Sequence, residues 1–307
     1  MKLVIPPIAD GQRLDRWLKK ALPEVPYVAV QKMLRTGDIR VDGKRAKGDA
    51  RLVAGQVVEV GGSRNKGQGA RENGASVYQI TNADKAMLNQ AVVYEDDAVL
   101  VLNKPAGLAA QAGSGVSRSL DRLVAAMWPK NPPKLTHRLD KDTTGLIVLA
   151  KTRAAAQAVT AAFAGRDVRK TYRVLVVGKV PTPTGVVDAA IAKIAHSYGS
   201  HAVVDDLMGD EARTEWRVIA DRGPYTLLHA MPYTGRMNQI RVHMAHVGCP
   251  LVGDRKYGGE AAEHAAAALG YPKTLYLHAE RLVLPHPVTG QVLELSAPLP
   301  PHFAALT

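Results

Sequence analysis

A stretch of sixteen residues, GGSRNKGQGARENGAS at 61–76, divides the sequence into two parts. It holds five glycines and several charged residues but no large apolar side chain. Such a segment buries too little surface to offset the entropy lost on ordering. A chain of 307 residues is also longer than a single core usually allows. We therefore expect a small N-terminal domain at 1–60, a flexible linker at 61–83 and a larger domain at 84–307.

Several classes of protein are excluded by the composition. The longest apolar runs, such as LIVLA at 146–150, are far too short to span a membrane. The first fifteen residues lack the sustained apolar region and the cleavage site of a secretory signal. The single cysteine, Cys249, excludes an internal disulfide and a cysteine metal cluster. We expect a cytoplasmic protein that does not associate with a membrane.

The charge balance favours a polyanionic partner. Forty Lys and Arg against 28 Asp and Glu give a formal charge of +12, which attracts nucleic acid and steers its approach. Residues 1–60 alone hold 12 basic and 7 acidic side chains. Net charge alone is also compatible with a soluble basic protein that binds no polyanion. Sequence motifs are needed to distinguish the two.

The N-terminal part contains two short helices and a hairpin in its pattern. Apolar residues at 14, 17, 18, 21 and 22 form a helical stripe among basic residues. A second helix is predicted at 28–35, ending at Thr36-Gly37. The Asp42-Gly43 pair between short strand-like runs is typical of a tight hairpin turn, and QVVEV at 56–60 completes the unit.

The segments RLDRWL, MLRTGDIRVDGKRAK and AGQVVEV, within 11–60, resemble the S4 domain, a small α/β RNA-binding fold. An ordinary basic domain with the same elements is the alternative. The resemblance implies RNA contacts from basic residues on the helices and hairpin, namely Arg13, Arg16, Lys32, Arg35, Arg40, Lys44 and Arg45.

The larger domain alternates short strands with helices. VYEDDAVLVLNKP (93–105) predicts a strand ending at a proline, GLIVLAK (145–151) a buried strand, and TYRVLVVG (171–178) another strand. SLDRLVAAMW (119–128) predicts a helix capped by Ser119, and RAAAQAVTAAFAG (153–165) a helix that stops at Gly165. This mixture predicts an α+β fold.

Two segments place charged side chains next to apolar elements, where they could form part of an active site. In HRLDKDTTGLIVLAK (137–151), an extended backbone would direct Arg138 and Asp140 to one side, directly before a buried strand. An ordinary surface ion pair, with Asp142 capping a turn, is the alternative. In TGRMNQIRVHMAH (234–246), a helix would place Arg241 within an apolar stripe. That guanidinium either extends to solvent or pairs with a buried carboxylate.

His137, His243 and His246 raise the question of a metal site. The last two are three residues apart, but no third ligand of matching spacing follows. We predict no metal.

The segment at 137–151 closely resembles the signature of the RluA family of pseudouridine synthases, His-Arg-Leu-Asp, two variable residues, Thr, Ser or Thr, Gly and Leu. Further family blocks occur in order, so that the likeness covers about 94–302: VLNKPAGL at 101–108, KTYRVLV at 170–176, TGRMNQIRVHMAHVGCPLVGDRKYG at 234–258 and LHAERLVLPHP at 277–287. Two positions depart from the pattern. Gln111 and Asn238 stand where the family often has His, which puts local substrate contacts in doubt rather than the reaction.

The resemblance implies a mixed or antiparallel central sheet of the pseudouridine synthase type and a set of roles. Asp140 is implied to be the nucleophile, and Arg241 its partner through two parallel hydrogen bonds. A neighbouring cation would lower the pKa of that acid. Tyr172 is implied to stack on the base, with proton abstraction as a second role, and Arg138 to fill the gap left by an extruded uridine. Substrate contacts are further implied for Asn103, Lys104, Arg236, Asn238 and Gln239.

The implied reaction breaks the bond from uracil N1 to the ribose and joins C5 to the same carbon. It consumes no cofactor, and the sequence has no Walker loop and no strand-linked GxGxxG. Attack of Asp140 on the ribose, attack on the ring, and assistance to elimination at the sugar all stay open. The order of the blocks resembles the RluC- and RluD-like branch, which modifies large-subunit ribosomal RNA, and we expect a monomer without a protein partner.

Three other functions stay open. The first is a non-catalytic S4-type RNA-binding protein, against which the intact Asp140, Tyr172 and Arg241 argue. The second is a pseudouridine synthase acting on transfer RNA. The third is a glycosidase or nucleosidase that cleaves without rejoining, which would need a second carboxylate at a defined separation; Asp142 is too close in sequence to Asp140 to promise one.

Overall fold

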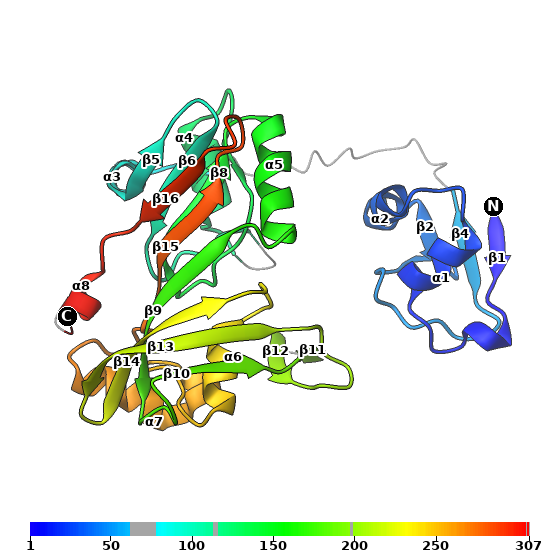
Figure 1. Cartoon of the computed structure of the whole chain (residues 1–307). Helices are drawn as coiled ribbons and strands as arrows, with labels where there is room; N and C mark the ends of the chain where they lie inside the picture. Colours follow the sequence, from blue (N-terminus) through cyan, green and yellow to red (C-terminus); the bar gives the residue numbers. More distant parts are fainter. Residues whose placement is uncertain (62–77, 113–115, 197–198, 305, 307) are drawn as a thin grey trace. The chain divides into compact units, whose positions relative to one another are not determined.

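The computed structural model describes residues 1–61, 78–112, 116–196, 199–304 and 306. Contacts divide the chain into two compact units, Met1–Gly74 and Ala75–Thr307, which are drawn in Figure 1. Across these described ranges, no helix is both long and apolar enough to cross a lipid bilayer.

The N-terminal unit is a four-stranded antiparallel sheet with two helices. The strands follow the order β1-β4-β2-β3. The predicted hairpin is confirmed: Asp42 and Gly43 have φ angles of 48° and 74°, as a type I′ turn requires. The elements are β1 (Lys2–Val4), η1 (Pro7–Ala9), α1 (Leu14–Ala21), α2 (Tyr27–Thr36), β2 (Ile39–Val41), β3 (Lys44–Arg45) and β4 (Val57–Val60).

The second unit is built around a large mixed sheet, as its α+β pattern predicts (Figure 1). Its helices are α3 (Asn82–Ala91), α4 (Leu120–Met127), α5 (Arg153–Ala164), α6 (Gln239–His246), α7 (Arg255–Ala268) and α8 (Pro301–Ala304). Its strands are β5 (Val92–Glu95), β6 (Val99–Lys104), β7 (Lys134–Leu135), β8 (Thr144–Ala150), β9 (Arg169–Val177), β10 (Thr184–Asp188), β11 (Ile191–His196), β12 (Gly199–Val204), β13 (Arg213–Arg222), β14 (Tyr225–Pro232), β15 (Leu277–Pro285) and β16 (Val292–Ser296).

The main path of the sheet is β10-β13-β14-β9-β15-β8-β6-β5, with β16 beside β15, β7 beside β8, and a separate β11-β12 hairpin. Among the pairs formed by described residues, only β8 and β15 run parallel. β15 thus joins the half of the sheet containing β8, β6 and β5 to the half containing β9, β14, β13 and β10.

The strand β8 is buried along its whole length because both faces of its half of the sheet are covered. Leu146 and Val148 pack toward α5 on one face, and Ile147 and Leu149 toward α4 on the other. This alternation follows from the two-residue repeat of a strand. It explains why the sequence here is continuously apolar.

Three differences from the predicted elements have local causes. Residues 78–83, assigned above to the linker, belong to the second unit, because Tyr78 and Ile80 pack on its core and Thr81 caps α3 through a capping box. The single strand predicted at 93–105 is a hairpin of β5 and β6, because the Asp96 carboxylate accepts bonds from the amides of Ala98 and Val99 and turns the chain. The helix predicted at 234–246 starts only at Gln239.

Glycine is required at one point of this framework. Gly145 has a φ of 108°, and a Cβ there would lie 2.3 Å from the carbonyl oxygen of Ala279, the residue that pairs with it across the parallel strands. The close approach of β8 and β15 therefore depends on the missing side chain.

Gly145→Ala should lower the free energy of unfolding of the second unit by at least about 2 kcal/mol, since it combines left-handed strain with overpacking. The matched control is Gly107→Ala, where φ is 76° but no atom lies within 4 Å of the added carbon. Denaturant unfolding should show a clearly smaller loss for that variant. Equal losses would mean that the strand contact is not tight.

Candidate active site

A cavity of about 740 Å³ opens where the two halves of the sheet meet. One wall is the segment leading into β8 together with the end of α5, and the other is the start of β9, the end of β14 and the loop into α6. Among the described lining residues Asp140 is the single carboxylate, whereas the cations are five: Arg138, Arg166, Lys170, Arg236 and Arg241. The cavity therefore attracts anions and holds one acid.

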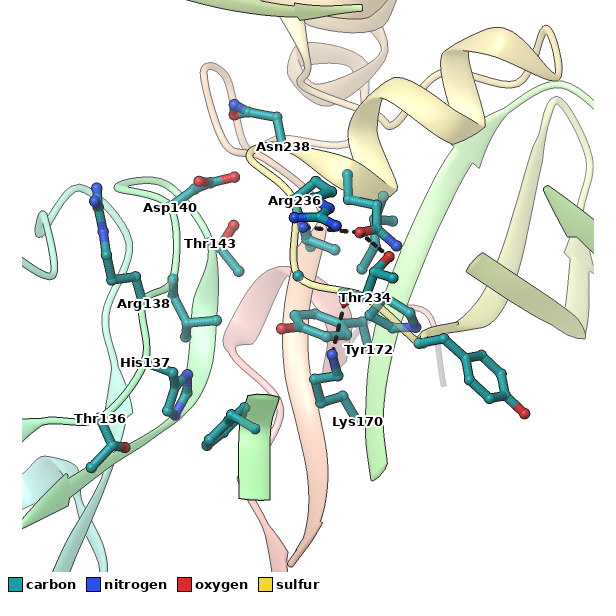
Figure 2. Close-up of a pocket in the computed structure, with 18 of the residues that line it drawn as sticks. Thr136, His137, Arg138, Asp140, Thr143, Lys170, Tyr172, Thr234, Arg236 and Asn238 are labelled. Carbon is teal, nitrogen blue, oxygen red and sulfur yellow. Dashed lines mark hydrogen bonds between the residues drawn. The ribbon is translucent and has the colours of Figure 1, made fainter. Parts of the chain in front are cut away.

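All four residues at 137–140 line the cavity, but their exposure differs, as an extended backbone predicts. Leu139 is buried in the core, whereas Arg138 is exposed and Asp140 half-buried, and both line the cavity. Figure 2 shows Arg138, Asp140 and Thr143 on the same wall. Thr143 is buried, and its hydroxyl has no hydrogen-bond partner among the described residues.

His137 serves as a neutral structural group rather than a base. The amide of Val148 donates a hydrogen bond of 2.9 Å to its Nε2, and its ring stacks on Phe163 at 4.3 Å between centroids. Burial lowers the pKa of His137 to about 3. The ring therefore ties the Asp140 segment to β8.

Lys104 lies beneath the Asp140 segment and is fully buried. Its ammonium donates hydrogen bonds to the carbonyls of Pro105, Leu108 and Lys141, at 2.9, 2.9 and 3.0 Å. Burial lowers the pKa of Lys104 to about 8, although Asp142 and Asp140 oppose that shift. Lys104 is not among the described residues that line the cavity, so the structure does not support the expectation that it contacts substrate.

The expected pair between Arg241 and Asp140 is also wrong. Arg241 donates two parallel hydrogen bonds to Asp254, of 2.7 and 2.6 Å, and no direct contact with Asp140 occurs among the hydrogen bonds and ion pairs of the described residues. Asp254, rather than Asp140, is the partner of Arg241. Its carboxylate is fully buried and also accepts bonds from the first amides of α7. The guanidinium further lies over the ring of Tyr257, at 5.1 Å.

The pKa of Asp140 is raised rather than lowered, contrary to the sequence prediction. Burial of the carboxyl is the largest cause, and the opposing cations, of which Arg241 contributes most, followed by Lys104 and Arg138, do not outweigh it. Arg241 thus acts on Asp140 through space rather than through hydrogen bonds.

Tyr172 and Lys170 extend from β9 into the cavity. Figure 2 shows the hydroxyl of Tyr172 directed toward the wall that carries Asp140. Burial and the charge of Asp140 raise the pKa of this phenol well above its usual range. Lys170 donates a hydrogen bond of 2.9 Å to the carbonyl of Thr234, and burial lowers its pKa to about 8. It holds the two strands of this wall together.

The remaining expected substrate contacts divide between cavity and framework. Arg236 and Asn238 line the cavity, and Asn238 has a φ of 55°, a left-handed conformation that Asn tolerates better than most residues. Gln239 reaches the lining, but its amide is saturated by bonds with Thr234, Arg236, Arg213 and Thr214. Asn103 instead donates to the carbonyl of Pro298 and is not among the described lining residues.

The basic residues expected to bind RNA in the N-terminal unit are mostly at its surface. Arg16, Arg35 and Lys44 are exposed, and Arg13 and Arg16 line a shallow hollow together with Lys20 and Arg51. Arg13 pairs with Asp15. Arg40 and Arg45 donate to turn carbonyls yet stay exposed. Lys32 lies in α2, but its side chain is outside the described part of the structure.

Four residues around the cavity escaped the sequence analysis: Thr143, Arg166, Lys170 and Asp254. Lys170 belongs to the Lys-x-Tyr block and could have been taken from it. Asp254, two residues after a buried strand-like run and directly before a helix, carries the signal of an N-cap. Two of the three histidines weighed as metal ligands have other partners: His137 accepts a bond from the amide of Val148, and His243 bonds Thr214 and the carbonyl of Ala189. The described residues contain no cluster of three His, Cys, Asp or Glu side chains.

Comparison with known proteins gives consistent similarities. A protein family described as RNA pseudouridylate synthase matches residues 98–246. The chain is 35% identical to ribosomal large subunit pseudouridine synthase C of Vibrio cholerae, over 95% of this chain and 91% of that protein. It is 34% identical to the protein of the same name from Escherichia coli, over 94% of this chain and 90% of that protein.

A solved structure shares the fold of the second unit. Human RNA pseudouridylate synthase domain containing 4 superposes with a TM-score of 0.61 at 28% identity, covering 72% of this chain and 93% of that one.

Lys104→Met should lower the free energy of unfolding by about 3 kcal/mol, because three buried carbonyls lose their donor. Its neighbour Lys141 has an exposed side chain, so Lys141→Met should change stability by less than about 0.5 kcal/mol. Urea denaturation of both variants checks this. A Lys104 variant as stable as the Lys141 control would show that the buried ammonium does not hold the loops.

Proposed function

The chain belongs to the RluA family of RNA pseudouridine synthases, and we propose that it converts uridines of large-subunit ribosomal RNA to pseudouridine, with Asp140 as the nucleophile. The observation that supports the role of Asp140 is that it is the single carboxylate among the described residues lining a cavity rich in cations. A carboxylate in such surroundings is available to a substrate that brings negative phosphates with it.

Large-subunit ribosomal RNA is favoured as substrate because the relatives from Vibrio cholerae and Escherichia coli, both named for that subunit, match the chain over nine tenths of their length. Transfer RNA is the alternative substrate. We further propose that the protein acts in the cytoplasm as a monomer and needs no cofactor.

The chemistry is assigned to the cavity residues as follows. A uridine leaves its stack and enters the cavity, while Arg138, the exposed cation beside Asp140, takes the space left in the RNA. The ionised Asp140 attacks the ribose or the ring, or assists elimination at the sugar. The N1 bond to the ribose breaks, the uracil turns, and C5 bonds to the same carbon as any bond to Asp140 breaks. C5 then loses its proton, and N1, freed from the sugar, takes one up, so that the product is an isomer of the substrate and Asp140 is regenerated. Arg241 offsets the negative charge at the site throughout.

Tyr172 is better suited to stacking than to taking a proton. Its raised pKa keeps the phenol protonated at neutral pH, and a protonated phenol has no basic oxygen to offer. Its ring extends from the wall opposite Asp140 (Figure 2), which suits a planar contact with a base.

The N-terminal unit is proposed to bind RNA as an S4 domain. Its exposed Arg and Lys side chains suit phosphate contacts. Because a glycine-rich segment joins the two units, RNA bound to the N-terminal unit would be held at a high local concentration near the second unit.

A glycosidase is disfavoured by the composition of the cavity. Such enzymes use two carboxylates on either side of the bond, and the described lining offers Asp140 alone.

The proposal is tested in cells that lack this protein, supplied with the wild-type gene or with Asp140→Asn. Mapping pseudouridine in large-subunit ribosomal RNA and in transfer RNA should show sites restored by the wild-type gene only, and in the ribosomal RNA. Purified Asp140→Asn should bind the same RNA with nearly unchanged affinity, because the isosteric amide removes the nucleophile and little else.

Turnover by Asp140→Asn would overturn the assignment of the nucleophile. Restoration confined to transfer RNA would overturn the choice of substrate, and release of free uracil would indicate cleavage without rejoining.

The pH dependence of turnover follows from the raised pKa of Asp140. Only the ionised carboxylate is active, so kcat at saturating RNA should fall with decreasing pH at a higher pH than an ordinary Asp would give. Arg138→Gln removes one of the cations that favour ionisation and should move this acid limb to higher pH. Arg138→Lys keeps the charge and should leave the limb in place. If kcat fell at the same pH in the wild type, Arg138→Gln and Arg138→Lys, ionisation of Asp140 would not control the acid limb.

A further inference from the structure

An ion pair joins the two walls at the mouth of the cavity. Arg166, which follows α5 on the β8 side of the sheet, donates a bond of 2.8 Å to the carboxylate of Glu211, which precedes β13 on the other side of β9. Arg166 lines the cavity, and Glu211 is not among the described lining residues. Arg236, a second lining cation, donates to the backbone carbonyl of Glu211 and lies 3.5 Å from Asp210.

The pair is too exposed to serve stability. The side chains of Arg166 and Glu211 are 49% and 60% exposed, and ion pairs in such surroundings stabilise a fold little or not at all. A phosphate oxygen could therefore replace the carboxylate at small cost. A phosphate could also accept two parallel bonds from the guanidinium, in place of the bond from Nη2 to Glu211.

The backbone of Arg166 gives an independent reason to assign a function. The amides of Gly165 and Asp167 close the end of α5 by bonding the carbonyls of Ala161 and Ala162. In this arrangement the residue after the cap is left-handed, and glycine is the favoured residue there. The chain has its glycine one position earlier, in right-handed geometry, and Arg166 with a φ of 65° in the left-handed position. A left-handed arginine that lines a cavity points to a role for its side chain.

We propose that Arg166 binds a phosphate of the RNA strand that enters the cavity, and that Glu211 holds its guanidinium in place until the phosphate displaces the carboxylate. This inference rests on the proposed function, since it takes RNA as the substrate. Glu211 then raises selectivity, because a ligand must supply a well-placed anion to release Arg166.

The test is equilibrium binding of the full-length protein to unmodified large-subunit ribosomal RNA transcript across a series of KCl concentrations. Arg166→Gly should weaken binding three- to tenfold near 0.1 M salt and reduce the slope of log affinity against log salt by roughly 0.7 to 0.9, the loss of one phosphate contact. Its thermal unfolding midpoint should be at least as high as that of the wild type, because glycine relieves the left-handed strain. Loss of binding with retained stability separates contact from folding.

Glu211→Gln should tighten binding about two- to fivefold at low salt, since the competing anion is gone. In the Arg166→Gly background the same change should have no effect. Arg217→Gln is the charge control, because Arg217 is exposed on β13 and is not among the described lining residues. It should leave the affinity within about twofold.

Wild-type affinity and slope in Arg166→Gly would overturn the phosphate contact and leave the proposed function standing. An equal loss in Arg217→Gln would overturn it as well, because net charge alone would then explain the effect. Tightening by Glu211→Gln that persists without Arg166 would overturn the role of the ion pair. A wild-type protein that does not bind the transcript would overturn both this inference and the choice of RNA.

Discussion

The Lys104 ammonium, which has no contact with solvent, fixes the floor of the candidate site. Its three carbonyl acceptors belong to the turn after β6 and to the segment that follows Asp140, so one cation connects two loops that are 37 residues apart in sequence. Burying this charge costs free energy because the ammonium loses its hydration, and the same loss lowers the pKa of Lys104. The cost is offset only while all three oxygens stay in place. Together with His137, the buried ammonium thus helps to fix the position of the segment that carries Asp140.

The charges around Asp140 are arranged before any RNA arrives. Asp254 is fully buried and grips Arg241 through two hydrogen bonds while capping α7. The guanidinium therefore keeps one orientation, and its field reaches Asp140 without a direct bond. A carboxylate that is not hydrogen-bonded to its neighbouring cation keeps its lone pairs available to a bound molecule. Fixed charges of this kind stabilise a reacting group without reorganising when the reaction occurs.

Features of the structure that depend on neighbours in sequence could be predicted, whereas features that depend on contacts between distant residues could not. Local patterns were sufficient for α5, for the Asp42-Gly43 hairpin and for the buried strand β8, because each depends on neighbours in sequence. The side-chain direction of Asp140 also followed from strand alternation. The partner of Arg241 could not be predicted in this way. A buried guanidinium requires a carboxylate partner, but the sequence does not identify which carboxylate it is. Burial of Lys104 was likewise hidden, because it depends on two loops closing over a residue that ends an apolar strand. Tyr78 and Ile80, by contrast, were visible apolar residues that should have ended the linker earlier.

The parallel pairing of β8 and β15 has a consequence for how the protein is made. The walls that carry Asp140 and Tyr172 lie on β8 and β9, and these strands are not neighbours, because β15 lies between them. During synthesis the first 276 residues of the chain can form each half of the sheet, but the halves are joined only after β15 (Leu277–Pro285) has left the ribosome. Until then the parts of the β8 and β9 edges that β15 occupies are unpaired, and open edges can pair with wrong strands. The cavity is therefore complete only once a single inserted strand has converted two separate sheets into one.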